Sequence, residues 1–124
     1  WDMLPTVADL LKRPAPKNLD GVSIMPALNG GKVKANENRH LYWEFFERGF
    51  HQAVRWRDWK AVRLKDGGKA GAPIELYNLS TDLGETTDLA AKEPKIAAQI
   101  IHLMDTSRTP SPIWPSATKS ASEG

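Results

Sequence analysis

The sequence predicts an α+β fold. A four-stranded antiparallel sheet carries a C-terminal helix packed on one face, and a short helix and an irregular N-terminal segment precede the sheet. Three observations predict this class. Four short segments rich in aromatic and β-branched residues follow one another, with turn residues between them. A segment with apolar residues at helical spacing comes after the last of these strands. Consecutive strands followed by a helix favour an antiparallel sheet with the helix across it.

Residues 1–38 predict a connecting segment without a compact core of its own. A short helix is expected over residues 2–11, where leucine and valine side chains recur at helical spacing. Pro14 ends this helix. Residues 15–35 contain glycine turn signals and apolar residues of no strong period, so we expect irregular chain that lies against a larger body.

Four strands are expected in the central part of the chain. The link Arg57-Asp58 predicts a tight hairpin between the second and third strands, although it lacks the usual glycine. The glycine-rich residues 65–72 predict a flexible loop before the fourth strand. The strands are expected at 41–46, 52–56, 59–64 and 73–78, with a turn at 47–49.

The C-terminal part predicts one helix over residues 93–107. Pro94 fits its first turn, and isoleucine, leucine, methionine and alanine side chains form an apolar stripe along it. The proline-rich residues 109–115 predict an extended segment, and the small polar residues 116–124 predict a flexible tail. We therefore expect one α+β subdomain over residues 39–115.

Composition excludes several kinds of chemistry. The chain has 124 residues and a mass of 13.8 kDa, enough for one small domain. It contains no cysteine, which excludes disulfides, thiolate nucleophiles and zinc-thiolate sites. No apolar run is long enough to span a membrane, and no signal peptide opens the chain. A first residue of Trp1 rather than methionine suggests a piece of a longer protein.

The turn between the first two strands holds the best candidates for contact with a ligand. His51 lies there among Glu47, Arg48 and Gln52. Their charged and amide groups can hydrogen-bond an anion or a hydroxyl group. The alternative, which the residues leave open, is that this turn faces solvent.

No catalytic centre is predicted. A nucleophile needs a base and an orienting group nearby, and the sequence shows no such set. Glu44 and Glu47 lie three residues apart in and after a strand, a spacing that fixes no acid–base geometry. We expect structural roles for His40, hydrogen-bonded at the start of a strand, and for His102, beside the apolar stripe of the last helix. A small hydrolase built on His51 and these glutamates is therefore disfavoured.

The acidic segment after the fourth strand predicts turns rather than a metal site. Asp82, Glu85 and Asp88 lack the ligand spacing of an EF-hand calcium loop. Asp side chains satisfy free backbone N–H groups where a strand gives way to a helix. We expect turn and cap residues here, and no metal site in the chain.

Aromatic and basic residues alternate through the strands and leave two interpretations open. Six basic and two acidic residues occur from Arg48 to Asp66, with Trp56 and Trp59 among them and Trp43 shortly before them. Such a face could make the chain a free-standing binding module for an anionic glycan or a nucleic acid. The alternative is that the aromatic residues fill the core of a small sheet.

Four segments, in order, resemble the C-terminal part of sulfatases of the arylsulfatase type. Residues 75–90 resemble "ELYDLxxDPxExxNLA", and residues 52–63 resemble "QAVRxGDWKAVR". Residues 2–10 are similar to "DxxPTLxxL", and residues 19–30 to "LDGxSLxPLLxG". Residues 108–115 also look like a sulfatase ending. The chain departs from the pattern at two turn positions, with Leu83 for the usual proline and Asp88 for the usual asparagine.

The resemblance implies a fold and a division of labour. Sulfatases are similar to alkaline phosphatases: a large α/β domain carries the active site, and a small antiparallel sheet with a helix follows. Their nucleophile is a formylglycine made within a Cys/Ser-x-Pro-x-Arg motif, and their calcium ligands belong to the large domain. This chain lacks that motif. The resemblance thus implies calcium and formylglycine in a missing N-terminal catalytic domain, with no cofactor held by this chain.

For function, the resemblance implies the non-catalytic C-terminal portion of a sulfuric ester hydrolase acting on sulfated carbohydrates or aryl sulfates. We expect this piece to be inactive alone and to support the catalytic domain, with residues 1–38 connecting the two. Its turn is expected to reach the rim of the substrate pocket, with Arg48 or His51 meeting sulfate or sugar hydroxyl groups. The expected location is periplasmic or secreted, and neither nucleic acid nor membrane is an expected partner. A docked sheet should leave a large apolar patch, whereas a free module should bury its aromatics beside a polar groove.

Overall fold

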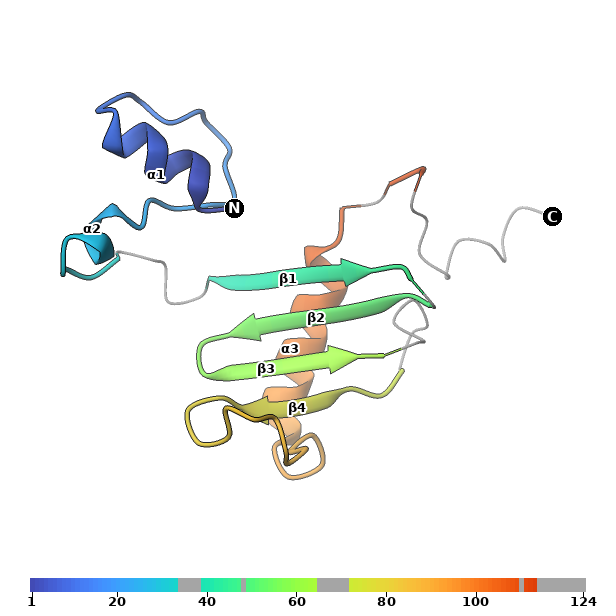
Figure 1. The fold of residues 1–124 in the computed structure, drawn as a ribbon. Coiled ribbons are helices and arrows are strands. Elements are labelled where there is room, and N and C mark those ends of the chain that lie inside the picture. The colour runs from blue at the N-terminus through green and yellow to red at the C-terminus, as the bar shows by residue number, and fades with distance from the viewer. Residues whose placement is uncertain (34–38, 48, 65–71, 110, 114–124) are drawn as a thin grey trace. The chain divides into compact units, whose positions relative to one another are not determined.

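The computed structural model describes residues 1–33, 39–47, 49–64, 72–109 and 111–113 (Figure 1). The chain divides into two units, residues 1–37 and residues 38–124. The loop expected at 65–72, apart from Ala72, and the tail expected at 116–124 lie outside the described residues.

The first unit contains two short helices, α1 (Met3–Leu10) and α2 (Met25–Leu28). The predicted first helix is confirmed. The expectation of wholly irregular chain over residues 15–35 is wrong at α2, a single turn with Pro26 at its start. Proline suits this position because its missing N–H would have no partner in a first turn. A single turn is too short to show the periodicity from which helices are predicted.

Polar side chains of α1 hold the following segment in place. Asp2 Oδ1 accepts a hydrogen bond from the backbone N–H of Val22 at 2.9 Å, and Thr6 Oγ1 accepts one from that of Ile24 at 3.1 Å. The buried residues of α1 are Pro5, Thr6 and Ala8, all small. The described part of the first unit therefore has no large buried hydrophobic side chain.

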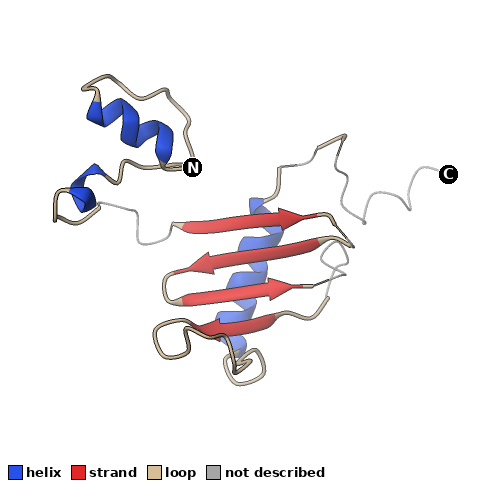
Figure 2. Ribbon diagram, viewed as in Figure 1, coloured by secondary structure: helices blue, strands red, loops and turns tan. Residues whose placement is uncertain are grey.

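The second unit is a four-stranded sheet covered by one helix (Figures 1 and 2). Its strands follow one another in chain order, and each is antiparallel to its neighbour. The helix α3 (Pro94–Ser107) crosses one face of the sheet. The predicted fold class is confirmed, with strand bounds that differ from the expected ones by one or two residues. The strands are β1 (His40–Phe45), β2 (His51–Trp56), β3 (Trp59–Arg63) and β4 (Glu75–Asn78).

The predicted hairpin between β2 and β3 is present. Trp56 lies opposite Trp59 at its end, and Arg57-Asp58 forms the link. Arg57 takes the left-handed conformation, with φ of 54°, that glycine would adopt more readily. Its guanidinium carbon lies 4.6 Å from the centroid of the Trp56 ring, a cation–π contact that offsets part of this cost.

The core lies between α3 and the sheet. Val54, Leu76, Ile100 and Met104 are its fully buried large side chains. Trp56, Ala61 and Ala97 complete the cluster.

The apolar side chains of β1 do not all face the core. Tyr42 pairs with Val54 and packs against the core, so the alternate residues of β1 face α3. The apolar set Leu41, Trp43 and Phe45 therefore points away from the helix. Trp43 is 41% exposed and Phe45 is 56% exposed. We call this side, opposite α3, the outer face.

Candidate functional site

A chain of polar side chains runs between the sheet and the C-terminal part of α3. Gln52 is buried, and its Nε2 donates to Tyr42 Oη at 2.7 Å, which in turn donates to Glu44 Oε1 at 2.7 Å. Arg63 Nη1 donates to Gln52 Oε1 and to Asp105 Oδ1, both at 3.0 Å. We call these five residues the polar network. It joins three strands to α3 by hydrogen bonds, so it fixes where the helix lies across the sheet.

The polar network alters the chemistry of its members. Burial, followed by the hydrogen bond to Glu44, raises the pKa of Tyr42 above its usual range. Arg63 is only 2% exposed, and its Nε has no hydrogen-bond partner among the described residues. Glu44 Oε1 also lies 3.0 Å from Arg108 Nε, an ion pair shielded from water. The polar groups of the network hydrogen-bond one another, so we assign the network a structural role.

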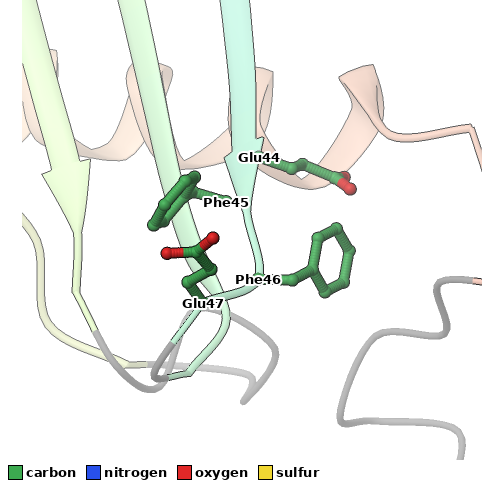
Figure 3. A pocket seen from close by; sticks show the side chains of 4 residues that line it. All are labelled: Glu44, Phe45, Phe46 and Glu47. Carbon is green, nitrogen blue, oxygen red and sulfur yellow. The ribbon is translucent and has the colours of Figure 1, made fainter.

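The β1–β2 turn borders a pocket of about 360 Å³ lined by Glu44, Phe45, Phe46 and Glu47 (Figure 3). In the figure, Glu44 and Phe46 point to one side of the chain, and Phe45 and Glu47 to the other. The two carboxylates therefore diverge and form no acid–base pair. This agrees with the sequence-based argument against such a pair.

The four predicted ligand-contact residues lie in different environments. Glu47 is exposed at the pocket, and His51 is half-buried on the outer face, with its ring centroid 6.2 Å from that of Phe45. Gln52 faces α3 within the polar network. Arg48 lies outside the described residues. The structure thus brings Glu47 and His51 to accessible positions, whereas Gln52 is turned inward.

The other two histidines lie away from this turn. His40 Nε2 is 2.6 Å from Ser107 Oγ, which confirms the expected hydrogen bond at the start of the strand. His102 is exposed on α3. The backbone O of His102 accepts a hydrogen bond from Thr106 Oγ1 at 2.8 Å, a contact that does not involve the imidazole ring.

The acidic segment after β4 forms turns, as predicted. Asp82 Oδ2 accepts hydrogen bonds from the backbone N–H groups of Thr86 and Thr87 at 2.8 and 2.9 Å. These bonds, that from Thr87 first, hold the pKa of Asp82 below its usual value. Asp88 Oδ1 accepts from the N–H groups of Leu76 and Ala90, both at 2.9 Å. The side-chain oxygen of an asparagine would accept the same two hydrogen bonds, so Asp88 can replace the asparagine that is usual at this position of the pattern.

One detail of that expectation is wrong. None of these acidic side chains caps α3, whose N-cap residue is Glu93 without a side-chain capping bond. Glu85 instead pairs with Lys60, its oxygens lying 2.6 and 2.7 Å from Lys60 Nζ. Over the part of the chain that the structure describes, no three His, Asp or Glu side chains gather as a metal-binding group.

Sequence reasoning missed the polar network, although a signal for it was present. Gln52 lies two residues before the buried Val54 on β2, and Arg63 lies two residues after the buried Ala61 on β3, so both occupy inward-facing positions. A polar residue at an inward position of a strand must find a buried partner. Asp105, on the last turn of α3, is the carboxylate that the helix supplies.

None of the helices among the described residues is long and apolar enough to cross a membrane.

Comparison with known proteins identifies relatives of this architecture, although no family model matches the chain. Arylsulfatase K of Bos taurus is 32% identical over 111 residues, which cover 80% of this chain and 19% of that protein. A sulfatase of Formosa agariphila is 36% identical over 104 residues, covering 75% of this chain and 19% of its own length. The chain spans about a fifth of the length of the curated relatives that it matches.

Solved structures give the same result. A 2-O GAG sulfatase superimposes with a TM-score of 0.68 at 31% identity, over 86% of this chain and 23% of that one. The resemblance expected from the sequence is confirmed by relatives and by fold. The chain belongs to the sulfatase family and corresponds to the C-terminal part of these enzymes.

Proposed function

We propose that this chain is the non-catalytic C-terminal portion of an enzyme that hydrolyses sulfate esters, and that it supports that enzyme's catalytic domain. The observation that carries the proposal is the similarity to sulfatases over 75–80% of the chain, combined with coverage of only 19% of their length. The described residues also show no nucleophile held by a base and an orienting group. The reacting groups are then supplied by the remainder of the enzyme.

Exposed apolar side chains support docking on a larger body. In α1, Met3 is 72% exposed, Leu10 is 62% exposed, and the adjoining Leu11 is 64% exposed. Such surface is costly in water and commonly marks a protein–protein contact. The occupant that we propose is the catalytic domain of the same enzyme, since the matched relatives are about five times as long as the part that this chain covers.

The cofactors of the family do not fit the described residues. Calcium takes six to eight oxygen ligands. The described part of the chain holds no group of three candidate ligand side chains, and the sequence has no Cys/Ser-x-Pro-x-Arg motif for conversion to formylglycine. We therefore propose that calcium and formylglycine belong to the catalytic domain, and that no step of the reaction uses a cofactor bound here.

The β1–β2 turn is the proposed contribution of this chain to the substrate pocket. Glu47 and His51 lie at accessible positions on it, and Arg48 lies between them in the sequence. An arginine or a protonated histidine donates charge-assisted hydrogen bonds to a sulfate oxygen, and Glu47 accepts them from sugar hydroxyl groups. The substrate class we propose is a sulfated saccharide, because the 31%-identical structure is that of a 2-O GAG sulfatase.

Kinetics of the enzyme that contains this chain test the proposal. Arg48→Ala and His51→Ala should each lower kcat/KM on a sulfated disaccharide about tenfold, the loss of one charge-assisted hydrogen bond. Lys95→Ala, on the exposed start of α3, is the control and should leave kcat/KM unchanged. If both turn variants match this control, the turn has no role at the substrate pocket. If the enzyme releases no sulfate from any ester, the proposed function is wrong.

A further inference from the structure

The outer face carries an open groove that the proposed function does not use. Its volume is about 500 Å³, within the range of small-molecule sites. Trp43, Arg55 and Lys60 of the sheet line it together with Leu83 and Glu85 from the segment after β4. All five residues lie within the second unit.

Among the described residues that line the groove, Arg55 is a cation without a carboxylate partner. Lys60 is neutralised by Glu85, whose oxygens lie 2.6 and 2.7 Å from its Nζ. Arg55 is exposed, and its guanidinium group has no carboxylate partner within the described ranges. A planar guanidinium group pairs with an oxyanion through two parallel hydrogen bonds. The groove therefore favours a ligand with one anionic group.

An aromatic surface lies beside that cation. Trp43 is 41% exposed and lies opposite Ala53, two residues before Arg55 on the same face. Such diagonal neighbours are about 7–8 Å apart, close enough to contact one ligand together. The indole ring offers a flat apolar surface, and the C–H face of a pyranose ring packs on such surfaces. The ion pair of Lys60 and Glu85 adds a donor and an acceptor for hydroxyl groups.

We propose that this groove binds one unit of a sulfated saccharide, with the sugar ring on Trp43 and the sulfate group on Arg55. The choice of sulfate as the anion rests on the proposed function, whereas the aromatic and cationic surfaces do not depend on it. Nucleic acid is the less favoured occupant. Its backbone needs several uncompensated cations, and Glu85 would repel it.

Calorimetric titration of the 124-residue chain tests this proposal directly. The probes are a heparin-derived tetrasaccharide, the same tetrasaccharide after desulfation, and a twelve-residue oligothymidine. The sulfated probe should bind, and desulfation should weaken binding about tenfold, as should Arg55→Gln. Lys95→Gln removes one positive charge from the exposed start of α3 and should leave binding unchanged. Trp43→Ala should weaken binding, and Trp43→Phe should restore most of it because a flat ring is retained.

Three outcomes would overturn the proposal. These are no binding of the sulfated probe, equal weakening by Arg55→Gln and Lys95→Gln, and tighter binding of the oligothymidine than of the tetrasaccharide. Amide chemical shifts of the wild-type chain give a second measurement that needs no variant, since the largest changes should fall at Trp43 and Arg55. Binding requires no turnover, so an inactive parent enzyme would refute the proposed function and leave this result standing.

Discussion

Replacement of Ile100 by alanine tests the packing of α3 on the sheet. Ile100 is 0% exposed and belongs to the core with Val54 and Leu76. The change removes three carbon groups at about 0.8 kcal/mol each, or roughly 2.4 kcal/mol of burial. A residual cavity adds about 24 cal/mol per Å³, so roughly 40 Å³ left unfilled costs about 1 kcal/mol more. We expect Ile100→Ala to lower the free energy of unfolding by about 3–4 kcal/mol.

Urea unfolding followed by far-ultraviolet circular dichroism measures this loss. With a slope of about 1.5 kcal/mol per molar urea, the midpoint should fall by about 2 M. Small domains are stable by as little as about 5 kcal/mol, so the variant should be partly unfolded at 37 °C. Ile113→Ala is the matched control, because Ile113 is 77% exposed and its truncation should cost under about 0.5 kcal/mol. If the two variants agree within about 1 kcal/mol, α3 does not form the core described above.

Three further predictions concern the turns and the titrating groups. Because the pKa of Asp82 is lowered in the folded chain, its hydrogen bonds stabilise the turn fully above the usual carboxyl pKa, and this stability is lost as pH falls through the lowered pKa. The amide chemical shifts of Thr86 and Thr87 should therefore change below about pH 4. Asp82→Ala should abolish that transition. The hydrogen bond to Glu75 and burial raise the pKa of Tyr77 to about 12. The stability that this phenol contributes to the fold is therefore complete below about pH 10 and lost as pH rises through about 12. In an ultraviolet titration Glu75→Gln should lower the pKa of Tyr77, and an unchanged value would refute the assignment. A Cβ at Gly21 would clash with the backbone O of Trp1, so Gly21→Ala should displace Val22 from Asp2 and shift the amide resonance of Val22. Gly84→Ala, whose nearest contact would lie at 3.4 Å, should be tolerated and serves as the control.

The fold was predictable because its signals are local. Period-two alternation of aromatic and β-branched residues marks the strands, and the apolar stripe of residues 93–107 marks the helix. The Arg57-Asp58 link fixes the register between β2 and β3, since a two-residue connection leaves one way to pair them. Proline at the first turn of α3 indicates where the helix begins.

What could not be predicted depends on contacts between distant residues. The set Leu41, Trp43 and Phe45 would be assigned to the core from composition, yet the pairing of Tyr42 with Val54 turns it outward. Gln52 was expected to contact a ligand because it lies near a turn. Its buried partner is Arg63, 11 residues further along the chain, and Arg63 in turn bonds Asp105, 53 residues beyond Gln52, so these contacts exist only in the folded chain.

Sulfate release by the enzyme that contains this chain tests whether catalysis belongs to the rest of that enzyme. Hydrolysis of an aryl sulfate and of a sulfated disaccharide would be measured for that enzyme and for the separate 124-residue chain at equal concentration. We expect sulfate release by the whole enzyme and none by the separate chain, even when circular dichroism shows that the chain is folded. Turnover by the separate chain would contradict this expectation, because the chain would then hold a catalytic centre of its own.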